Sequence, residues 1–230
     1  MAYSGARNTA IQLTQQEEEL FGILLKTLEH QHLNTVLRCA GGWVRDKLLG
    51  KDSHDIDIAI DNKLGGEFAE HVNTYLSSQD LETRRIAVIE SNPEQSKHLE
   101  TARMKVAGLE LDLVNLRSEQ YADQTSRIPT MEFGTPEQDA LRRDLTINSL
   151  FYNINTREVE DFTGKGLDDL LEHRLIRTPL PPSETFRDDP LRVLRAIRFG
   201  ARFGFRLDEE LEQAAASEPV SLYSFLTIQL

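Results

Sequence analysis

The spacing of apolar and polar residues predicts a first helix and a strand, turn and helix after it. Thr14 and Glu17 form the pattern of a capping box, and apolar residues at positions 20, 23, 24 and 28 follow at helical spacing. A short apolar run then ends at Ala40, two glycines follow, and residues 43–49 again have a helical pattern. The dozen residues before Thr14 have no such periodicity, and we expect them to be loose.

Further along, period-two alternation predicts the strands of a sheet, with a helix between the first two. The predicted strands are residues 55–60, 85–90, 98–106 and 109–116, and the helix is residues 66–76. Thr135, Pro136 and Gln138 give an N-cap, a first-turn proline and an N3 partner, so another helix is expected to run to about Leu150. Short strands at 151–154 and 157–162 complete a sheet with helices to one side.

The character of the chain changes after three prolines at positions 179, 181 and 182. Asp189 and Pro190 then begin a basic helix that is expected to reach about Phe203. We therefore place a domain boundary near Thr178.

Composition and charge limit the classes of protein and partner. With 39% apolar and 28% charged residues the chain is typical of a globular protein, and no apolar run is long enough for a membrane helix. Without a secretory signal pattern, we expect a cytoplasmic, nuclear or mitochondrial protein. The net charge of -12 argues against a general polyanion-binding surface, so any RNA contact needs locally concentrated basic residues, as in 187–206. The single cysteine, Cys39, is expected to be a buried structural thiol.

Gly41 and Gly42, between a strand and a helix, allow the backbone to approach an anion such as a triphosphate. Arg45 adds a cation one turn into that helix. Taken alone, two glycines are better explained by a plain tight turn.

Asp55 and Asp57 are two residues apart on a strand, so both carboxylates are expected on one face while the neighbouring isoleucines point into the core. Two adjacent carboxylates beside a phosphate site suit Mg²⁺ and metal-assisted nucleotidyl transfer. A solvated edge strand is the alternative. His54 and Asp55 could also be the metal pair of a phosphohydrolase, which would need further ligands on separate helices. Asp112 is either a third metal-site carboxylate or a strand-edge residue.

Four motifs occur in a fixed order and carry a resemblance to a known family. They are the stretch 41–50 followed by Asp55 and Asp57, the stretch 142–144 with Asn148, the glycine-containing stretch 161–169, and the stretch 188–192. Over residues 32–210 the chain resembles class II tRNA nucleotidyltransferases and bacterial-type poly(A) polymerases. Its linker at 91–97 is similar to that of eukaryotic members.

The resemblance implies an α+β fold in three parts: an N-terminal helical extension (1–31), a nucleotidyltransferase head with a mixed sheet and flanking helices (32–177), and a partial all-helical neck (178–230). It further implies that Gly42 and Arg45 hold the triphosphate, that Asp55 and Asp57 hold Mg²⁺, and that residues 161–169 are a flexible element. Arg143 and Asp144 would contact the phosphate and ribose of the incoming nucleotide. By themselves, residues 142–144 could simply line the exposed face of a helix.

The basic helix predicts how the base is read. Arg192, Arg195, Arg198 and Arg202 form one stripe, and an apolar stripe of residues 191, 194, 197 and 201 is expected to pack beside it. A carboxylate at Asp189 can accept from the amino group of cytosine or adenine while Arg192 donates to the ring nitrogen; guanine and uracil present the reverse pattern. By resemblance, Arg195 and Arg198 support the nucleotide. Asp189 is also the obvious N-cap.

Together with the resemblance, which implies tRNA as the acceptor, these patterns predict a template-independent nucleotidyltransferase that adds CMP and AMP, from CTP and ATP, to the 3′ end of tRNA. A poly(A) polymerase or a partial CC- or A-adding enzyme shares the same motifs. Family members continue through further helical domains that clamp tRNA, and residues 220–230 differ from that continuation. An inactive nucleotide-binding fragment is therefore the alternative from another class.

Overall fold

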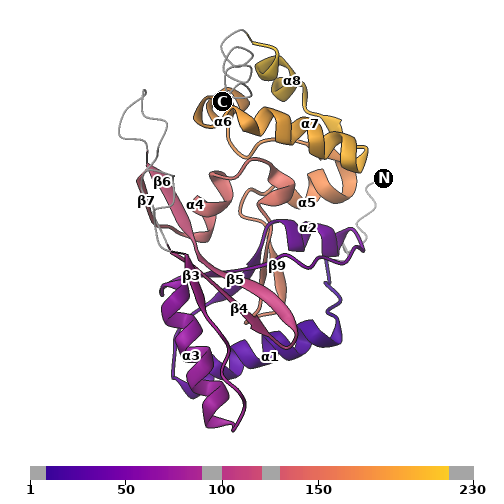
Figure 1. Cartoon of the computed structure of the whole chain (residues 1–230). Helices are drawn as coiled ribbons and strands as arrows, with labels where there is room; N and C mark the ends of the chain where they lie inside the picture. Colours follow the sequence, from indigo (N-terminus) through magenta and orange to yellow (C-terminus); the bar gives the residue numbers. More distant parts are fainter. Residues whose placement is uncertain (1–8, 90–99, 121–129, 218–230) are drawn as a thin grey trace.

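A seven-stranded mixed sheet is the centre of the fold in the computed structural model of the chain, which describes residues 9–89, 100–120 and 130–217 (Figure 1). The strand order is β3-β4-β5-β2-β1-β8-β9, in which β2 and β5 are parallel and the other neighbours antiparallel. This confirms the predicted mixed α+β fold. The strands are β1 (Leu37–Ala40), β2 (Ile56–Ile60), β3 (Ala87–Ile89), β4 (Thr101–Val106), β5 (Leu109–Asn115), β8 (Phe151–Asn153) and β9 (Glu158–Glu160).

Helices α1 (Gln15–His30) and α3 (Gly65–Ser78) pack against each other and against the sheet (Figure 1). The capping box predicted at the start of α1 is present, with the Glu17 amide donating to Thr14 Oγ1 at 3.2 Å and the Thr14 amide donating to Glu17 Oε2 at 2.7 Å. Phe21, Leu24 and Phe68 lie in the core with Cys39, which is fully buried as expected. The segment before the predicted head thus contributes to the same core.

Glu17 also fixes the helix that follows the glycine pair, α2 (Gly42–Leu48). Its carboxylate accepts from Trp43 Nε1 at 3.0 Å and forms an ion pair of 2.7 Å with Lys47 Nζ. Burial by itself raises the pKa of Glu17, but these contacts and the Thr14 amide outweigh it and hold the pKa below its usual value. The N-terminal helix therefore supports the wall of the cleft described below.

The predicted helix from Thr135 to about Leu150 is wrong in length. Its capping box is present, but α4 (Pro136–Leu141) ends where the Asp144 carboxylate accepts from the next amide, that of Leu145, and only a 3₁₀ turn follows at Thr146–Asn148. β-Branched Thr146 and Ile147 favour this break. Two strands, β6 (Arg117–Gln120) and β7 (Thr130–Phe133), were not predicted; they pair with each other beside α4.

The C-terminal part consists of α5 (Gly166–Asp168) with a π-helical turn at Asp169–His173, β10 (Leu175–Ile176), α6 (Pro182–Asp188), α7 (Leu191–Phe203), β11 (Arg206–Leu207) and α8 (Glu209–Ala215). The sequence predicted α7 but neither α6 nor the pairing of β10 with β11. Before α5, the Asp161 carboxylate accepts from the amides of Thr163, Gly164 and Leu167 and forms a tight turn. Among the described helices, none has both the length and the apolarity needed to cross a membrane.

The packing face predicted for α7 is also wrong. Leu191, Leu194 and Ile197 are exposed, at 43%, 41% and 50%, and the buried residues are Val193, Ala196, Phe199 and Gly200. An added Cβ at Gly200 would lie only 3.2 Å from Leu207, so small residues allow α7 to lie close to β11. The linker at 91–97 and the segment 220–230 lie outside the described residues.

Candidate active site

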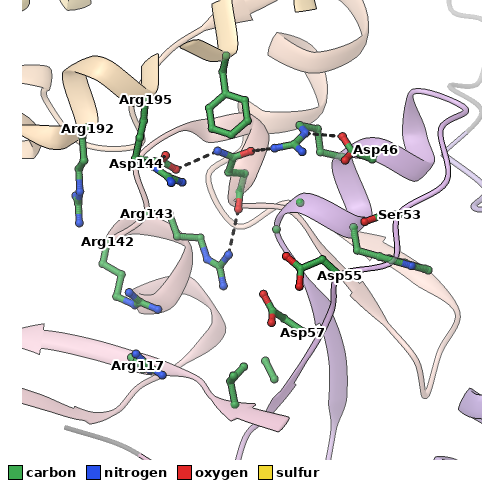
Figure 2. Close-up of a pocket in the computed structure, with 18 of the residues that line it drawn as sticks. Asp46, Ser53, Asp55, Asp57, Arg117, Arg142, Arg143, Asp144, Arg192 and Arg195 are labelled. Carbon is green, nitrogen blue, oxygen red and sulfur yellow. Dashed lines mark hydrogen bonds and ion pairs between the residues drawn. The ribbon is translucent and has the colours of Figure 1, made fainter. Parts of the chain in front are cut away.

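A cleft of about 820 Å³ lies between the sheet and α7, and most of the predicted site residues line it (Figure 2). Its walls come from α2, β2, β6, the end of α4 and α7. Seven arginines and six aspartates contribute to the lining. Charged groups are thus concentrated here, in a chain whose net charge is strongly negative.

Gly41 is the position at which the turn between β1 and α2 requires glycine. Its φ is +67°, in the left-handed region that other residues rarely adopt. An added Cβ would also lie 2.7 Å from Arg143 Nη1 and 3.3 Å from the carbonyl oxygen of Asn148. At Gly42 the nearest group would be Arg45 Nη2 at 3.6 Å, an ordinary contact. The two glycines therefore have different roles. Gly41 makes the turn, and Gly42 leaves the first residue of α2 without a side chain beside the cleft.

Asp55 and Asp57 lie side by side at the cleft (Figure 2). The strand begins at Ile56, one residue later than predicted, so Asp55 is exposed just before it and Asp57 is half-buried within it. Burial, together with the negative charges of Asp55 and Asp112, raises the pKa of Asp57 to about 6. The charges of Arg143 and Arg117 offset this only in part. The remaining negative charge on two adjacent carboxylates fits a hard divalent cation, which in proteins commonly takes one or two carboxylates and completes its shell with phosphate oxygens and water.

Asp112 lies next to Asp57, in the interior strand β5. It is therefore not a strand-edge residue. Its carboxylate accepts two hydrogen bonds from Arg103 on the adjacent strand, from Nε at 2.6 Å and from Nη2 at 2.7 Å. Asp112 thus adds negative charge beside Asp57 while its own oxygens are engaged by a guanidinium.

Asp139, which the sequence did not single out, organises the arginines opposite the carboxylate pair. Its Oδ1 accepts from Arg142 and from the backbone amide of Arg117, and its Oδ2 accepts from Arg143 Nε at 2.9 Å and Nη2 at 2.7 Å. Burial alone raises the pKa of Asp139, but the charges and hydrogen bonds of Arg143 and Arg142 outweigh it and lower the pKa. These arginines line the cleft rather than the exposed face of a helix.

A chain of polar contacts joins the motif at 142–148 to both α2 and α7 (Figure 2). Asp144 Oδ2 accepts from Arg195 Nε at 2.6 Å, and its Oδ1 accepts from Asn148 Nδ2 at 3.1 Å. Asn148 Oδ1 in turn accepts from Arg45 Nη1, whose neighbouring Nε donates to Asp46 at 2.8 Å. Asp144 and Arg45 are both nearly buried. Five residues from three elements therefore fix one another's orientation.

On α7, Arg192, Arg195 and Arg202 line the cleft, but Arg198 does not. Six residues at 100° each place Arg198 about 120° from Arg192 around the helix, and its guanidinium instead lies 5.1 Å from the ring centroid of Phe199. Asp189 lines the cleft with its side chain 45% exposed, 3.9 Å from Arg192 Nε. Its Oδ1 also accepts from the Leu191 amide at 3.0 Å. The N-cap of α7 is nevertheless Pro190, with no side-chain cap, so the prediction of Asp189 as the N-cap is wrong by one residue.

Several lining residues carried no recognisable signal in the sequence. Arg117 lies on the unpredicted strand β6, and its charge acts on Asp57. Phe199 resembled an ordinary core residue. For Asp139, which orients these arginines, the sequence does contain a local signal. It lies four residues before Arg143, and a carboxylate and a guanidinium at that spacing are neighbours on a helix.

Comparison with known proteins is consistent with this geometry. Residues 37–177 match the poly A polymerase head domain. The chain is 58% identical over 179 residues to the mitochondrial CCA tRNA nucleotidyltransferase of Saccharomyces cerevisiae, covering 76% of this chain and 32% of that one. It is 50% identical over 209 residues to the tRNA nucleotidyltransferase cca1 of Schizosaccharomyces pombe, covering 88% and 41%.

Solved structures agree. A CCA-adding enzyme (apo form II) superposes with a TM-score of 0.72 at 31% identity, covering 88% of this chain and 44% of that one. A CCA-adding enzyme in complex with CTP superposes with a TM-score of 0.69 at 29% identity, covering 94% of this chain and 45% of that one. The chain therefore spans less than half the length of these relatives. By its matched domain and its sequence identity, the chain belongs to the poly(A) polymerase and CCA tRNA nucleotidyltransferase family.

Proposed function

We propose that this chain catalyses template-independent transfer of CMP and AMP, from CTP and ATP, to the 3′ end of tRNA. One observation carries the proposal: a single cleft contains the carboxylate pair, the glycine turn and the Asp189 and Arg192 side chains. The names of the relatives and the CTP held by a similar enzyme support the same reaction. Because the chain spans only part of their length, its engagement of a whole tRNA is part of the proposal.

Asp55 and Asp57 would hold Mg²⁺, a choice that their oxygen ligands and the raised pKa of Asp57 support. Bound there, the metal would lower the pKa of the attacking 3′-hydroxyl and neutralise the triphosphate. Asp112 is engaged by Arg103, so we assign it an indirect part: its negative charge strengthens the affinity of Asp57 for a cation.

The triphosphate would lie against Gly41, Gly42 and Arg143. Gly42 presents bare backbone at the cleft, and Arg143 is oriented toward Gly41 by its two hydrogen bonds to Asp139. A positioned guanidinium is a strong phosphate ligand because its hydrogen bonds are charge-assisted. Asp144 would accept from the ribose 2′-hydroxyl, and the bond from Arg195 holds its carboxylate in place for that contact.

Asp189 and Arg192 would read the base. The half-exposed Asp189 carboxylate can accept from the exocyclic amino group of cytosine or adenine, and Arg192 can donate to the neighbouring ring nitrogen. Uracil and guanine would present an oxygen to the carboxylate, so two acceptors would face each other and the hydrogen bond would be lost. Arg195 would support the bound nucleotide from the same face of α7, and Arg198, from outside the cleft, would do so through its contact with Phe199.

The direct test uses the purified chain with Mg²⁺, a tRNA that lacks its 3′ CCA, and each labelled NTP singly and together, with products resolved at single-nucleotide length. Ordered addition of C, C and A supports the proposal, and Asp55→Asn and Asp57→Asn should abolish it. Long adenylate tails would instead assign a poly(A) polymerase, and partial products a CC- or A-adding enzyme. Binding of CTP and ATP without any addition would make the chain an inactive nucleotide-binding fragment.

A further inference from the structure

Arg45 lines the cleft, but its guanidinium is directed at protein groups. Its side chain is only 5% exposed. Nε donates to Asp46 Oδ1 at 2.8 Å, and Nη1 donates to Asn148 Oδ1. A cation whose main task is to bind an incoming triphosphate would be expected to present these donors to the cleft. The burial and the partners of Arg45 instead indicate a group that holds other parts of the site.

The aromatic contacts of Arg45 join α2 to the base-reading helix. The guanidinium carbon lies 4.9 Å from the ring centroid of Phe199 and 5.0 Å from that of Phe203. These two rings are nearly parallel, with an interplanar angle of 8° and centroids 5.8 Å apart. A planar guanidinium over aromatic faces is attractive when desolvated, and lysine does not reproduce its stacking geometry.

The position of these rings on α7 makes the contact relevant to the base. Phe199 is seven positions after Arg192 and Phe203 is eleven positions after it, so each ring lies within about 20° of Arg192 around the helix. Phe199 is about 10 Å along the axis from Arg192. Since α7 is one continuous helix, a change in its position at Phe199 also moves Arg192.

A second set of contacts, which is polar, also connects α7 to Arg45. Arg195, one turn after Arg192, bonds to Asp144, which bonds to Asn148, which bonds to Arg45 (Figure 2). Two independent sets of contacts, one aromatic and one polar, therefore run from α7 to the same guanidinium. Gly42, which begins α2 at the cleft, lies three residues before Arg45 in the same short helix.

We propose that Arg45 is a positioning residue: through Phe199, Phe203 and Asn148 it fixes the base-reading helix α7 relative to the glycine turn, and so sets the preference for CTP and ATP rather than the affinity for phosphate. The inference rests on the proposed function. It assigns the same effect to Phe199, which has no polar group to offer a nucleotide.

The experiment compares binding of CTP, UTP and inorganic tripolyphosphate, each with Mg²⁺, by titration calorimetry. The variants are Arg45→Met, Arg45→Lys, Phe199→Leu and the double variant of the last two. Arg157→Met is the matched control, because Arg157 forms an exposed ion pair with Glu18 outside the cleft lining. Thermal melting of each variant verifies folding. If Arg45→Met does not fold, Arg45→Lys and Phe199→Leu still test the proposal.

In Arg45→Lys and Phe199→Leu, we expect the preference for CTP over UTP to fall about tenfold while tripolyphosphate affinity stays within about twofold of wild type. The double variant should lose no more selectivity than the single variant that loses more, because both changes act on one connection. Restored selectivity with lysine, or a tenfold loss of tripolyphosphate binding in Arg45→Met, would show a phosphate ligand and overturn the inference. If the wild-type chain does not prefer CTP over UTP, the proposed function fails, and the inference with it.

Discussion

Replacing Asp57 with asparagine should make the metal-free protein more stable while removing a group needed for the proposed reaction. Asp57 is half-buried in β2, with the carboxylates of Asp55 and Asp112 nearby. In the absence of a cation these surroundings disfavour its negative charge. Asparagine has nearly the same shape and is neutral at every pH, so it removes this unfavourable interaction.

The size of the effect follows from the pKa of Asp57, which is raised from 3.8 to about 6. At about 1.4 kcal/mol for each pKa unit, the charged form costs the native state about 3 kcal/mol at neutral pH. Between these two pKa values the native protein binds more protons than the unfolded chain. The group's contribution to wild-type stability is therefore fully present below about pH 4 and is lost as the pH rises through 6. The advantage of the variant should follow the opposite course: largest at pH 8 and absent near pH 4.

Urea denaturation in EDTA at pH 8, 6.5 and 5, followed by circular dichroism, measures this difference. Asp55→Asn is the control, because Asp55 is exposed before the strand and its removal only relieves part of the repulsion; its gain should be smaller. Added Mg²⁺ should stabilise the wild type but not Asp57→Asn, because a ligand that binds only the native state stabilises it by mass action. A variant that is no more stable than wild type at pH 8, or equally more stable at every pH, would refute the reasoning.

Three further predictions follow from the structure. Gly41→Ala should destabilise the protein by about 1–2 kcal/mol, through its left-handed backbone and the close Arg143, whereas Gly42→Ala should have little effect on urea denaturation; equal losses would contradict the distinct roles. Asp139→Asn should cost about 3 kcal/mol at pH 7, because it leaves two guanidiniums without their buried counter-charge. Since the pKa of Asp139 is lowered, its contribution is present above about pH 4 and lost as pH falls through the native pKa, so the difference from wild type should shrink in acid. Ile197→Glu should change stability by no more than about 0.5 kcal/mol, whereas Val193→Glu should cost several times more; the reverse result would restore the packing face predicted from the sequence.

Local patterns predicted the elements whose boundaries are set by nearby side chains. Both capping boxes are present, and each predicted strand has a counterpart, because a cap or an alternating strand needs only residues a few positions apart. The end of α4 could not be predicted in this way. It depends on Asp144 bonding to Leu145 and Asn148, and on the Thr146 amide donating to the carbonyl of Arg177, 31 residues further along.

The packing of α7 shows a second limit. The helix has two apolar sides: Leu194 and Ile197 lie on the one that the described structure leaves exposed, and Val193 and Phe199 lie on the covered one. The covered side contains Ala196 and Gly200, where close approach to β11 matters more than the size of the side chain. Hydrophobicity alone could not choose between these two sides, because the choice is made by the shape of the partner.

Net charge was equally incomplete as a guide to the cleft. A net charge of -12 argues against a general surface for polyanions. The arginines of the cleft do not simply offset that charge, because most of them have carboxylate partners. These pairs are Arg45 with Asp46, Arg142 and Arg143 with Asp139, and Arg195 with Asp144. Such pairing lowers the general attraction for polyanions and fixes the direction of each guanidinium. A site of oriented donors recognises the pattern of hydrogen-bonding groups on a nucleotide, which is what the proposed selection of CTP and ATP without a template requires. Binding of free nucleotide should consequently depend less on ionic strength than binding of the tRNA phosphate backbone, whose affinity comes mainly from counterion release.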